Sequence, residues 1–483
     1  MKIFLVGSGI GGMSCAATLA YNGFDVTIIE QNDYFGGKAH RISEYGFQFD
    51  TGPCLLTYPD WFDELFISCG KNVKDYFQYQ RLDPITRYFL SDQHVDVSSD
   101  INQTAKNFEE KLGLKKVVFL NYIKRWIRIY DISEKIFLIN ELKFNFFFFK
   151  NALDWIFKAG VVNIFSSMAH YNKVLKNKSV EKIMNRFATY TGSSPYRTPA
   201  FMNQLAIVEM VKGGFYPNDG IHSISKALYR LCEDLGVKFQ FNTKIDSIIF
   251  KNNLFKFYSN GEVFTSNYLI SNIDYYKTQI LLDRKFNRKS LKLSTSAIVF
   301  YWGVKINSSN LKLHNIIFSE DYKNEFSQIF DNNLIPNDPT IYINITSKFD
   351  KNHAPENCEN WFVMINTPPN LDIVTEKNIN KTRKFIISKI SDKVGIDLEG
   401  SIIFEKILTP KTLENKTGSF NGSLYGDNQN SLISIIKRKK NKDHKLKKLY
   451  YVGGTVHPGG GMPLALRSGM NVAKNIINEI KYI

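Results

Sequence analysis

The first thirty residues constrain the fold more than any other part of the chain, because they read as a strand, a glycine-rich loop, a helix and a second strand. Residues 3–6 and 25–29 are short apolar runs, and residues 13–21 have the pattern of a helix. The loop that follows the first run has the spacing GxGxxG, with glycines at Gly7, Gly9 and Gly12. In this context the glycines permit a tight turn, and the helix start supplies N–H donors to a pyrophosphate. The sequence therefore predicts an α/β protein with a Rossmann-like dinucleotide-binding domain.

An acidic residue stands where such a fold meets the ribose. Glu30 lies 18 residues after Gly12, at the end of the second predicted strand. A carboxylate in this place can accept hydrogen bonds from the ribose hydroxyls, and its charge disfavours a 2′-phosphate. Glu30 therefore supports the dinucleotide interpretation over a glycine loop that serves packing alone.

A Gly-Gly-basic turn, Gly36-Gly37-Lys38, follows the second strand. It resembles the flavoprotein signature that comes after the ribose acid in the amine oxidase and carotenoid desaturase superfamily. In that superfamily the basic residue approaches the phosphates of FAD. The resemblance implies that the cofactor is FAD rather than NAD, and that Gly37 and Lys38 contribute to binding it.

The resemblance continues along nearly the whole chain, and its most specific part is the C-terminal segment 449–463. That segment is again a strand, a glycine loop and a helix start, and it resembles the second flavin motif of bacterial-type carotenoid desaturases of the phytoene desaturase family. Residues 46–53 resemble the family segment beside the isoalloxazine ring. The resemblance implies further FAD contacts at Pro53, Ile245, Gly454, Gly460, Gly461 and Met462. One departure is Asn218-Asp219-Gly220, where the family usually has a Gly-Gly pair.

The same resemblance implies a two-part architecture with a discontinuous FAD-binding domain and an α+β substrate domain. The FAD-binding domain is expected to comprise residues 1–84, 211–284 and 411–483. A helical region for substrate and membrane contact is expected over residues 85–210. The sheet of the substrate domain is expected over residues 285–410.

Composition points to an anionic partner. Lys and Arg number 62 and Asp and Glu 46, which leaves a net charge of +16. The run 437–448 alone carries eight basic residues and one acidic residue, and the segment 142–157 is rich in aromatic residues with lysines at intervals. Both suit peripheral attachment to an anionic membrane, although a solvated loop and a buried core helix would explain them as well. Nucleic acid is not expected, because no recognisable binding module accompanies the charge.

The remaining features favour a reducing compartment and no membrane-spanning segment. The five cysteines are scattered, without CxxC or Cys/His spacing, so neither a disulfide framework nor a metal site is predicted. The chain has no apolar stretch of about 18 residues or more. We therefore expect a cytoplasmic protein that attaches peripherally to the inner face of the membrane.

The chemistry implied by the resemblance is dehydrogenation of an acyclic carotenoid, with hydride passing from an allylic carbon to flavin N5. The flavin performs the redox step, so no catalytic triad is required, and quinone or oxygen would reoxidise it. Asp154 is a candidate side chain for proton transfer, and it fits that role only if it faces an apolar tunnel. His457, beside the second glycine loop, is expected to be a positioning residue.

Several alternatives share parts of this pattern. A terminal 3,4-desaturase of hydroxylated acyclic carotenoids, a flavin-dependent carotene isomerase and an amine oxidase would use the same cofactor. A prenyl-binding module like the GDP-dissociation inhibitors would use the fold without flavin chemistry. The intact Glu30, Gly37 and Lys38 weigh against that last possibility.

Overall fold

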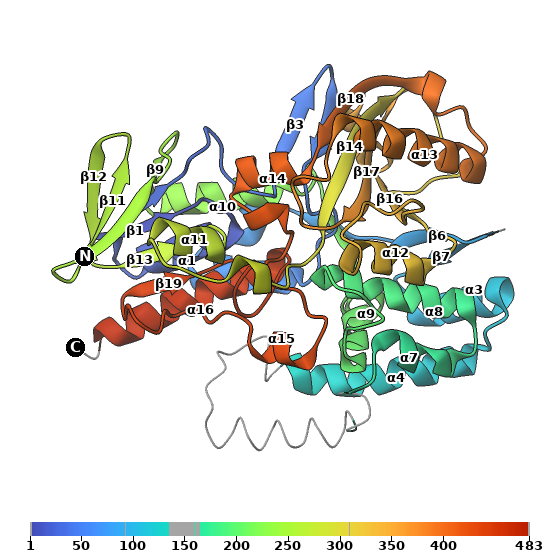
Figure 1. Cartoon of the computed structure of the whole chain (residues 1–483), viewed down its shortest axis with the longest axis horizontal. Coiled ribbons are helices and arrows are strands. Elements are labelled where there is room, and N and C mark those ends of the chain that lie inside the picture. Colours follow the sequence, from blue (N-terminus) through green and yellow to red (C-terminus); the bar gives the residue numbers. More distant parts are fainter. Residues whose placement is uncertain (1, 92, 135–159, 161–164, 309, 482–483) are drawn as a thin grey trace.

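The computed structural model describes residues 2–91, 93–134, 160, 165–308 and 310–481. Two sheets dominate it, one at each end of the molecule's long axis (Figure 1). Asp154 and the aromatic segment 142–157 lie outside the described residues. The mixture of a parallel sheet, antiparallel sheets and covering helices confirms the α/β class expected from the sequence.

The first sheet has five parallel strands drawn from distant parts of the chain. In spatial order they are β19 (Leu449–Tyr451), β13 (Leu269–Ser271), β1 (Lys2–Val6), β2 (Asp25–Ile29) and β9 (Lys238–Gln240). Strands from the start, the middle and the end of the sequence therefore form one sheet, as a discontinuous dinucleotide domain requires. The exact domain boundaries stay a prediction.

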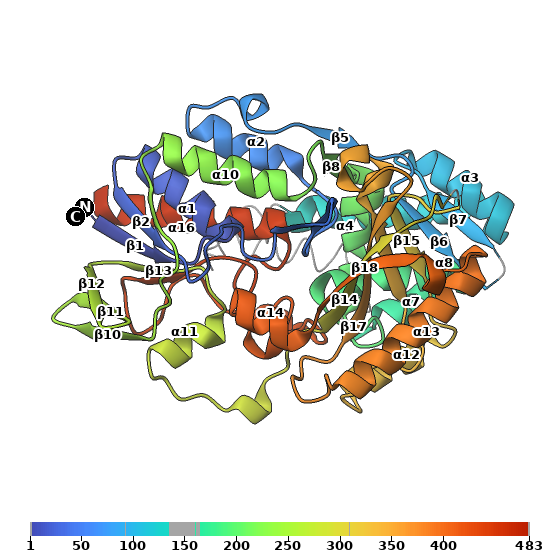
Figure 2. The same ribbon diagram turned by 90° about the horizontal axis from the view of Figure 1, so that it is seen from above.

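Both faces of this sheet are buried, which explains why its strands are apolar throughout. In β1, Ile3 and Leu5 belong to the core shared with the helices, whereas Phe4 and Val6 belong to a second core on the opposite face. The covering helices are α1 (Ile10–Tyr21), α10 (His222–Asp234) and α16 (Met462–Lys481), which lie side by side in Figure 2. The other face is covered by the antiparallel strands β10 (Ser247–Lys251), β11 (Leu254–Ser259) and β12 (Glu262–Ser266).

The turn between β11 and β12 is a two-residue hairpin loop at Asn260-Gly261, a pair of residues that favours this turn. Both residues have positive φ, 45° at Asn260 and 87° at Gly261. This backbone matches the twist of the flanking strands in a two-residue hairpin loop. Ser259 and Glu262 form the last pair of the ladder.

Helices α1 and α16 approach each other unusually closely, because glycines stand at their crossing. A Cβ atom at Gly469 would overlap the Ser14 hydroxyl and the Gly11 carbonyl. A Cβ atom at Gly11 would lie 2.9 Å from the Ala465 carbonyl oxygen. The Ser14 hydroxyl donates a hydrogen bond across the crossing to the Leu466 carbonyl, at 2.9 Å. The first and last helices of the chain are thereby fixed against one another.

The second sheet has seven strands and separates two different environments. In spatial order they are β18 (Ile402–Leu408), β14 (Ser296–Val304), β17 (Glu359–Thr367), β16 (Ile341–Ile345), β15 (His314–Ile317), β6 (Thr86–Phe89) and β7 (His94–Val97). Along β14, residues 298, 300, 302 and 304 pack with α13 (Glu376–Val394) in one core, while residues 297, 299 and 301 face the other way. This is the two-residue period of a strand buried on both faces.

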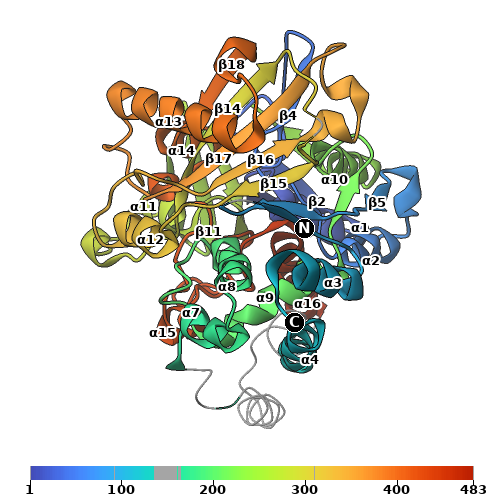
Figure 3. The same ribbon diagram turned by 90° about the vertical axis from the view of Figure 1, so that its right-hand side faces the viewer.

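Helices cover the lower side of the second sheet, and α13 covers its outer side (Figure 3). The lower helices are α3 (Ile101–Leu112), α4 (Lys116–Ser133), α7 (Met168–Asn172), α8 (Lys178–Asn185) and α9 (Leu205–Ile207). Further helices are α2 (Pro59–Ser68), α11 (Tyr275–Leu281), α12 (Tyr322–Phe330), α14 (Pro410–Thr417) and α15 (Leu432–Ile436). Among all helices of the described residues, none is both long enough and apolar enough to cross a bilayer.

One region differs from the sequence-based expectation. Residues 85–210 are expected to be helical, but the region begins with β6 and β7, which extend the second sheet. The reason is visible in His94-Val95-Asp96-Val97, where Val95 and Val97 are buried and their neighbours only partly so. An alternation over only four residues is a weak signal beside the long helices that follow.

The close crossing of α1 and α16 makes a testable prediction. We expect Gly469→Ala to lower the free energy of unfolding by about 1–3 kcal/mol or more, because the added methyl group meets backbone atoms that cannot move aside. Gly400→Ala is the matched control, since its methyl group would meet only the Asp397 carboxylate at an exposed site. Urea unfolding followed by fluorescence measures both. Equal stability of the two variants would contradict the importance of the crossing.

Candidate functional site

A single large cavity runs between the two sheets. It encloses about 1670 Å³, which exceeds the roughly 300–1,000 Å³ of a typical pocket for one small ligand. At one end it is lined by the two glycine loops that precede α1 and α16. At the other end it is lined by β14, β16 and β17 on one side and by α4 and α9 on the other. The cavity therefore has room for an extended cofactor and a second ligand.

The first glycine loop forms the wall of the cavity at the start of α1. Gly7 has a φ of +99°, which side chains disfavour, and Gly9 lies so close to Asn272 that a Cβ atom would come within 2.7 Å of its Oδ1. No side chain caps α1 at Gly9. The first N–H groups of the helix and its positive dipole end are thus available to an anionic ligand in the cavity.

Gly12 has a different role from the other two glycines of the motif. It does not line the cavity. A Cβ atom there would overlap the Gly7 carbonyl and lie 2.8 Å from Asn272 Oδ1. Gly12 therefore permits the helix to pack against the strand, as the third glycine of this fingerprint does.

Glu30 is held firmly at the cavity wall. One carboxylate oxygen accepts hydrogen bonds from the Ser8 backbone N–H at 2.9 Å and from the Ser8 hydroxyl at 2.7 Å. The other accepts from the Asn32 backbone N–H at 3.0 Å and from the Asn32 amide at 2.8 Å. These bonds fix the buried carboxylate between the first glycine loop and the end of β2, where it lines the cavity.

The Gly-Gly-Lys turn lies against the first glycine loop. Gly36 pairs with Gly9 in an isolated β-bridge, and Gly37 has a φ of +60°. Lys38 lines the cavity, and its Nζ donates a hydrogen bond to the Leu424 carbonyl at 2.7 Å. Burial lowers the pKa of the Lys38 ammonium to about 8, although the nearby Asp274 carboxylate acts in the opposite direction. The structure thus places a buried cation beside the cavity.

The second glycine loop forms the facing wall. Gly453 and Gly461 have φ values of +104° and +102°. A Cβ atom at Gly460 would overlap the Tyr425 ring, so this glycine permits a close approach. Gly454, Gly460, Gly461 and Met462 all line the cavity, and α16 begins at Met462. Pro53 and Ile245, from two other segments, also reach it.

Arg438 explains part of the basic run 437–448. Its Nη2 donates to the Gly454 carbonyl at 2.6 Å and its Nε donates to the Val456 carbonyl at 3.0 Å. Burial lowers the pKa of this guanidinium to about 10, and it lines the cavity. Lys439 and Lys442 pair with Asp427 and Glu479. The run is therefore not simply a solvated loop, because several of its charges bind the protein itself.

Asn272 and Asp274 are site residues to which the sequence analysis assigns no role, although segment 268–274 resembles a strand end of the family. The Asn272 amide donates to the Val452 carbonyl at 3.2 Å, which ties β13 to the second glycine loop. Asp274 lies buried at the cavity, and desolvation raises the pKa of its carboxyl to about 6. The signal that could have found both is their position at the carboxyl end of a central parallel strand, where such sheets bind ligands.

The segment Asn218-Asp219-Gly220, which departs from the family pattern, still forms a turn. Gly220, with a φ of +72°, is the left-handed residue, rather than Asn218 or Asp219. Asp219 instead pairs with Arg41 at 2.9 Å, and Lys226 pairs with its other oxygen at 3.2 Å.

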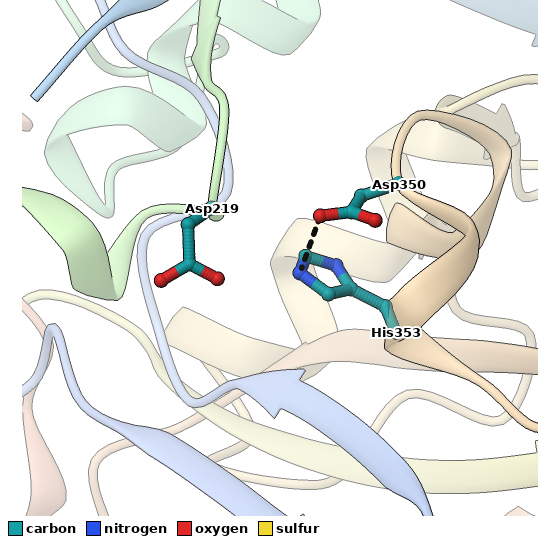
Figure 4. Close-up of side chains that lie close together, drawn as sticks. All are labelled: Asp219, Asp350 and His353. Carbon is teal, nitrogen blue, oxygen red and sulfur yellow. Dashed lines mark ion pairs between the residues drawn. The ribbon is translucent and has the colours of Figure 1, made fainter.

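Asp219 also lies near Asp350 and His353, and Figure 4 shows the three side chains facing a common space. The Asp350 carboxylate lies 3.7 Å from His353 Nε2. Because Arg41 and Lys226 already neutralise Asp219, this cluster has no excess negative charge that would require a metal ion.

The far half of the cavity is mainly apolar and aromatic. Its wall is formed by side chains of the second sheet that point away from α13, and by side chains of the lower helices. They include Val299, Tyr301, Tyr342, Phe362 and Met364 from the sheet and Tyr130, Phe201, Met202, Leu205 and Val208 from the helical side. A wall of this kind binds a long apolar molecule by shape.

Comparison with known proteins identifies the family. Residues 10–300 match the model of flavin containing amine oxidoreductases. The chain belongs to this family. It is 38% identical to a 1-hydroxycarotenoid 3,4-desaturase of Flavobacterium sp. strain P99-3, over 99% of each chain. It is 32% identical to a 4,4′-diaponeurosporene oxygenase of Staphylococcus haemolyticus, over 98% of this chain and 97% of the relative.

A solved structure of putrescine oxidase with bound putrescine superimposes with a TM-score of 0.63, covering 99% of each chain at 12% identity. It confirms the fold. As a member of the family, the chain is an FAD-dependent oxidoreductase, so the resemblance stated from its motifs is confirmed.

The residues present fit FAD. The buried Glu30 carboxylate stands where a ribose binds, and the uncapped start of α1 stands where a pyrophosphate binds. Gly461 leaves open space beside the start of α16. These residues disfavour the GDP-dissociation-inhibitor alternative, which would not need a carboxylate at the ribose position.

Glu30 provides a test of this assignment. We expect Glu30→Gln to weaken FAD binding at least about tenfold, because an amide cannot accept all the hydrogen bonds that hold the carboxylate at the ribose position. Glu359→Gln is the matched control, since Glu359 holds Ser308 in the same way outside the cavity, with bonds of 3.0 and 2.7 Å. Flavin absorbance per protein after gel filtration measures retention. Equal flavin loss in the two variants would contradict the ribose role.

The position of Lys38 beside the cavity predicts that FAD binding depends on pH. Its ammonium is charged below a pKa of about 8, and binding an anion raises that pKa. The affinity is therefore full below pH 8, and we expect it to fall above pH 8 by up to about tenfold per pH unit. Titration of the apoprotein with FAD at pH 7 and pH 9 measures this. Lys38→Met should remove the dependence, and an unchanged slope in that variant would show that another group is responsible.

Proposed function

We propose that this flavoenzyme desaturates an acyclic carotenoid. The observation that carries the proposal is the continuous cavity, whose far half is walled by apolar and aromatic side chains. A carotenoid offers its enzyme little more than length and shape, which such a wall can recognise. The names of the two relatives described above refer to carotenoid oxidation and support the same substrate class.

The chain's own residues align the substrate and exclude water, while bound FAD supplies the two-electron oxidant. Glu209 is the carboxylate in the apolar half of the described lining, and it is already paired with Arg186 at 2.9 Å. A cationic amine would therefore find no free carboxylate there, which favours a neutral substrate over the amine of an amine oxidase. Asp154, outside the described residues, stays a prediction for proton transfer.

Terminal 3,4-desaturation is the form of this activity that we favour over a phytoene desaturase or a carotene isomerase. The relative with 38% identity is named for that reaction on a 1-hydroxycarotenoid. Expression in a bacterium that accumulates acyclic carotenes, with and without a terminal hydroxyl, tests the proposal. We expect new pigments two hydrogens lighter by mass spectrometry. Isomers of unchanged mass would favour the isomerase, and unchanged pigments in a strain whose enzyme retains FAD would overturn desaturation.

We also propose that the protein binds the inner face of the membrane through the surface around α15, where hydrocarbon can enter. Ile433 and Ile436 are 63% and 64% exposed on this helix, and Phe165 is 78% exposed. Leu432 and Ile435, on the same helix, line the cavity. An exposed apolar surface next to an apolar cavity suits a substrate that partitions into lipid. The reduced flavin would then pass its electrons to a quinone in that membrane or to oxygen.

Vesicle flotation tests this surface. We expect Ile433→Asp with Ile436→Asp to lower the bound fraction several-fold, because two charges would have to enter the interface. Ile67→Asp is the matched control, since Ile67 is 68% exposed on α2 and does not line the cavity. Vesicles with and without anionic lipid separate the apolar contribution from the basic one. Equal flotation of the double variant and the control would contradict the assignment.

A further inference from the structure

A compact group of polar side chains interrupts the apolar half of the cavity. The Arg186 guanidinium bonds both oxygens of Glu209, with Nη2 at 3.0 and 2.9 Å. The Tyr190 hydroxyl donates to Glu209 Oε2, and the Thr86 hydroxyl lies 3.4 Å from Oε1. All four residues line the cavity. Since the two charges cancel, the group is polar but carries no net charge.

Two further polar side chains of the group each have an atom that forms no hydrogen bond with any described residue. They are His314 on β15 and Tyr322 at the start of α12, which are 2% and 4% exposed and both line the cavity. His314 Nε2 and the Tyr322 hydroxyl are buried without a hydrogen-bond partner among the described residues. Buried polar atoms of this kind are costly unless a ligand completes them.

The hydrogen bonds at Nδ1, the other ring nitrogen, determine whether His314 Nε2 donates or accepts a hydrogen bond. The Asn344 amide nitrogen donates a hydrogen bond to the Leu313 carbonyl at 3.0 Å, which identifies the nitrogen end of this amide. The same nitrogen lies 3.2 Å from His314 Nδ1. Nδ1 is therefore the acceptor, and the proton of the neutral ring is on Nε2. Burial lowers the pKa of His314 to about 3, with the Arg186 charge acting in the same direction, so the ring stays neutral at physiological pH.

The group lies next to the part of the cavity that faces the cofactor. Tyr342 bonds His314 Nδ1 at 2.8 Å and lines the cavity beside Cys54. Cys54 follows the loop at Gly52 and Pro53, whose sequence resembles the family segment beside the isoalloxazine ring. A substituent held by the polar group would therefore be close to the bond that reacts.

We propose that Tyr322, His314 and the Arg186–Glu209–Tyr190 group form a binding site for a hydroxyl at the end of the carotenoid. A hydroxyl both donates and accepts hydrogen bonds, so it can accept one from His314 Nε2–H and form another with the Tyr322 hydroxyl. The absence of net charge matches an alcohol better than a carboxylate or an amine. This inference rests on the proposed function, and it supplies a reason for 3,4-desaturation, because carbon 1 of an acyclic carotenoid is two bonds from carbon 3.

The experiment compares a 1-hydroxy acyclic carotene with its parent hydrocarbon of equal length and equal unsaturation, both presented in the same vesicles to the FAD-loaded enzyme. We expect wild-type kcat/KM to favour the hydroxylated substrate at least about tenfold, since a site with unpaired polar atoms rejects the analogue that lacks the hydroxyl. Tyr322→Phe should reduce this preference to within about threefold, mainly by lowering kcat/KM for the hydroxylated substrate.

Tyr322→Phe is expected to fold, because the hydroxyl that it removes has no partner within the described chain. Tyr122→Phe is the matched control, since it removes a buried hydroxyl that bonds Asn172 at 2.7 Å outside the cavity, and it should keep the preference. Tyr190→Phe is a second variant, whose preference should also fall because Glu209 loses a donor.

The outcomes separate this inference from the proposed function. If wild type desaturates both substrates equally, the hydroxyl site is overturned while carotenoid desaturation stands. If Tyr322→Phe and Tyr190→Phe slow both substrates by the same factor, the group is structural and the inference is overturned as well. If wild type desaturates neither substrate while it retains FAD, the proposed function itself fails.

Discussion

The contact on which the rest of the structure depends is the crossing of α1 and α16. Glycines at 11 and 469 bring the two helices together, so that the two glycine loops before them face one cavity. With ordinary side chains at this crossing the loops would be pushed apart, and neither loop alone encloses a dinucleotide. The dense packing of protein interiors makes such a contact intolerant of even one added methyl group. The cofactor site is therefore a consequence of how closely two helices can approach.

A second constraint divides the substrate side from the scaffold. In β14, β16 and β17 alternate residues belong to the α13 core, and the residues between them belong to the cavity wall. Nearly every residue of these strands is buried, but the two sets serve different purposes. The residues of the cavity wall can vary with the substrate, while the residues that pack against α13 keep the sheet attached to that helix. This separation allows one fold to carry different cavity walls.

The sequence predicts most of the residues that line the cofactor half of the cavity, because that pattern depends on glycine positions and one acid at fixed spacing, while their contacts with FAD stay a prediction. Gly7, Gly9, Glu30, Gly37, Lys38, Gly454 and Gly460 all reach the cavity, whereas Gly12 packs behind it. Arg438 could not be predicted, since nothing distinguishes one basic residue in a basic run until the fold buries it. The polar group around Glu209 could not be predicted from the sequence either, for a similar reason. Its members come from separate segments, and only the packing of the second sheet on the lower helices unites them.

The parallel sheet of the flavin domain has a consequence for how the protein is made. Its edge strand β19 and the helix α16 come from the last part of the chain, while β1 and α1 come from the first. During synthesis the first glycine loop lacks its facing wall until the ribosome has produced β19 and α16. The two walls of the flavin site therefore come together only after α16 has been synthesised. Until then the apolar interior reserved for α16 is exposed, so this chain has particular need of protection from aggregation while it grows.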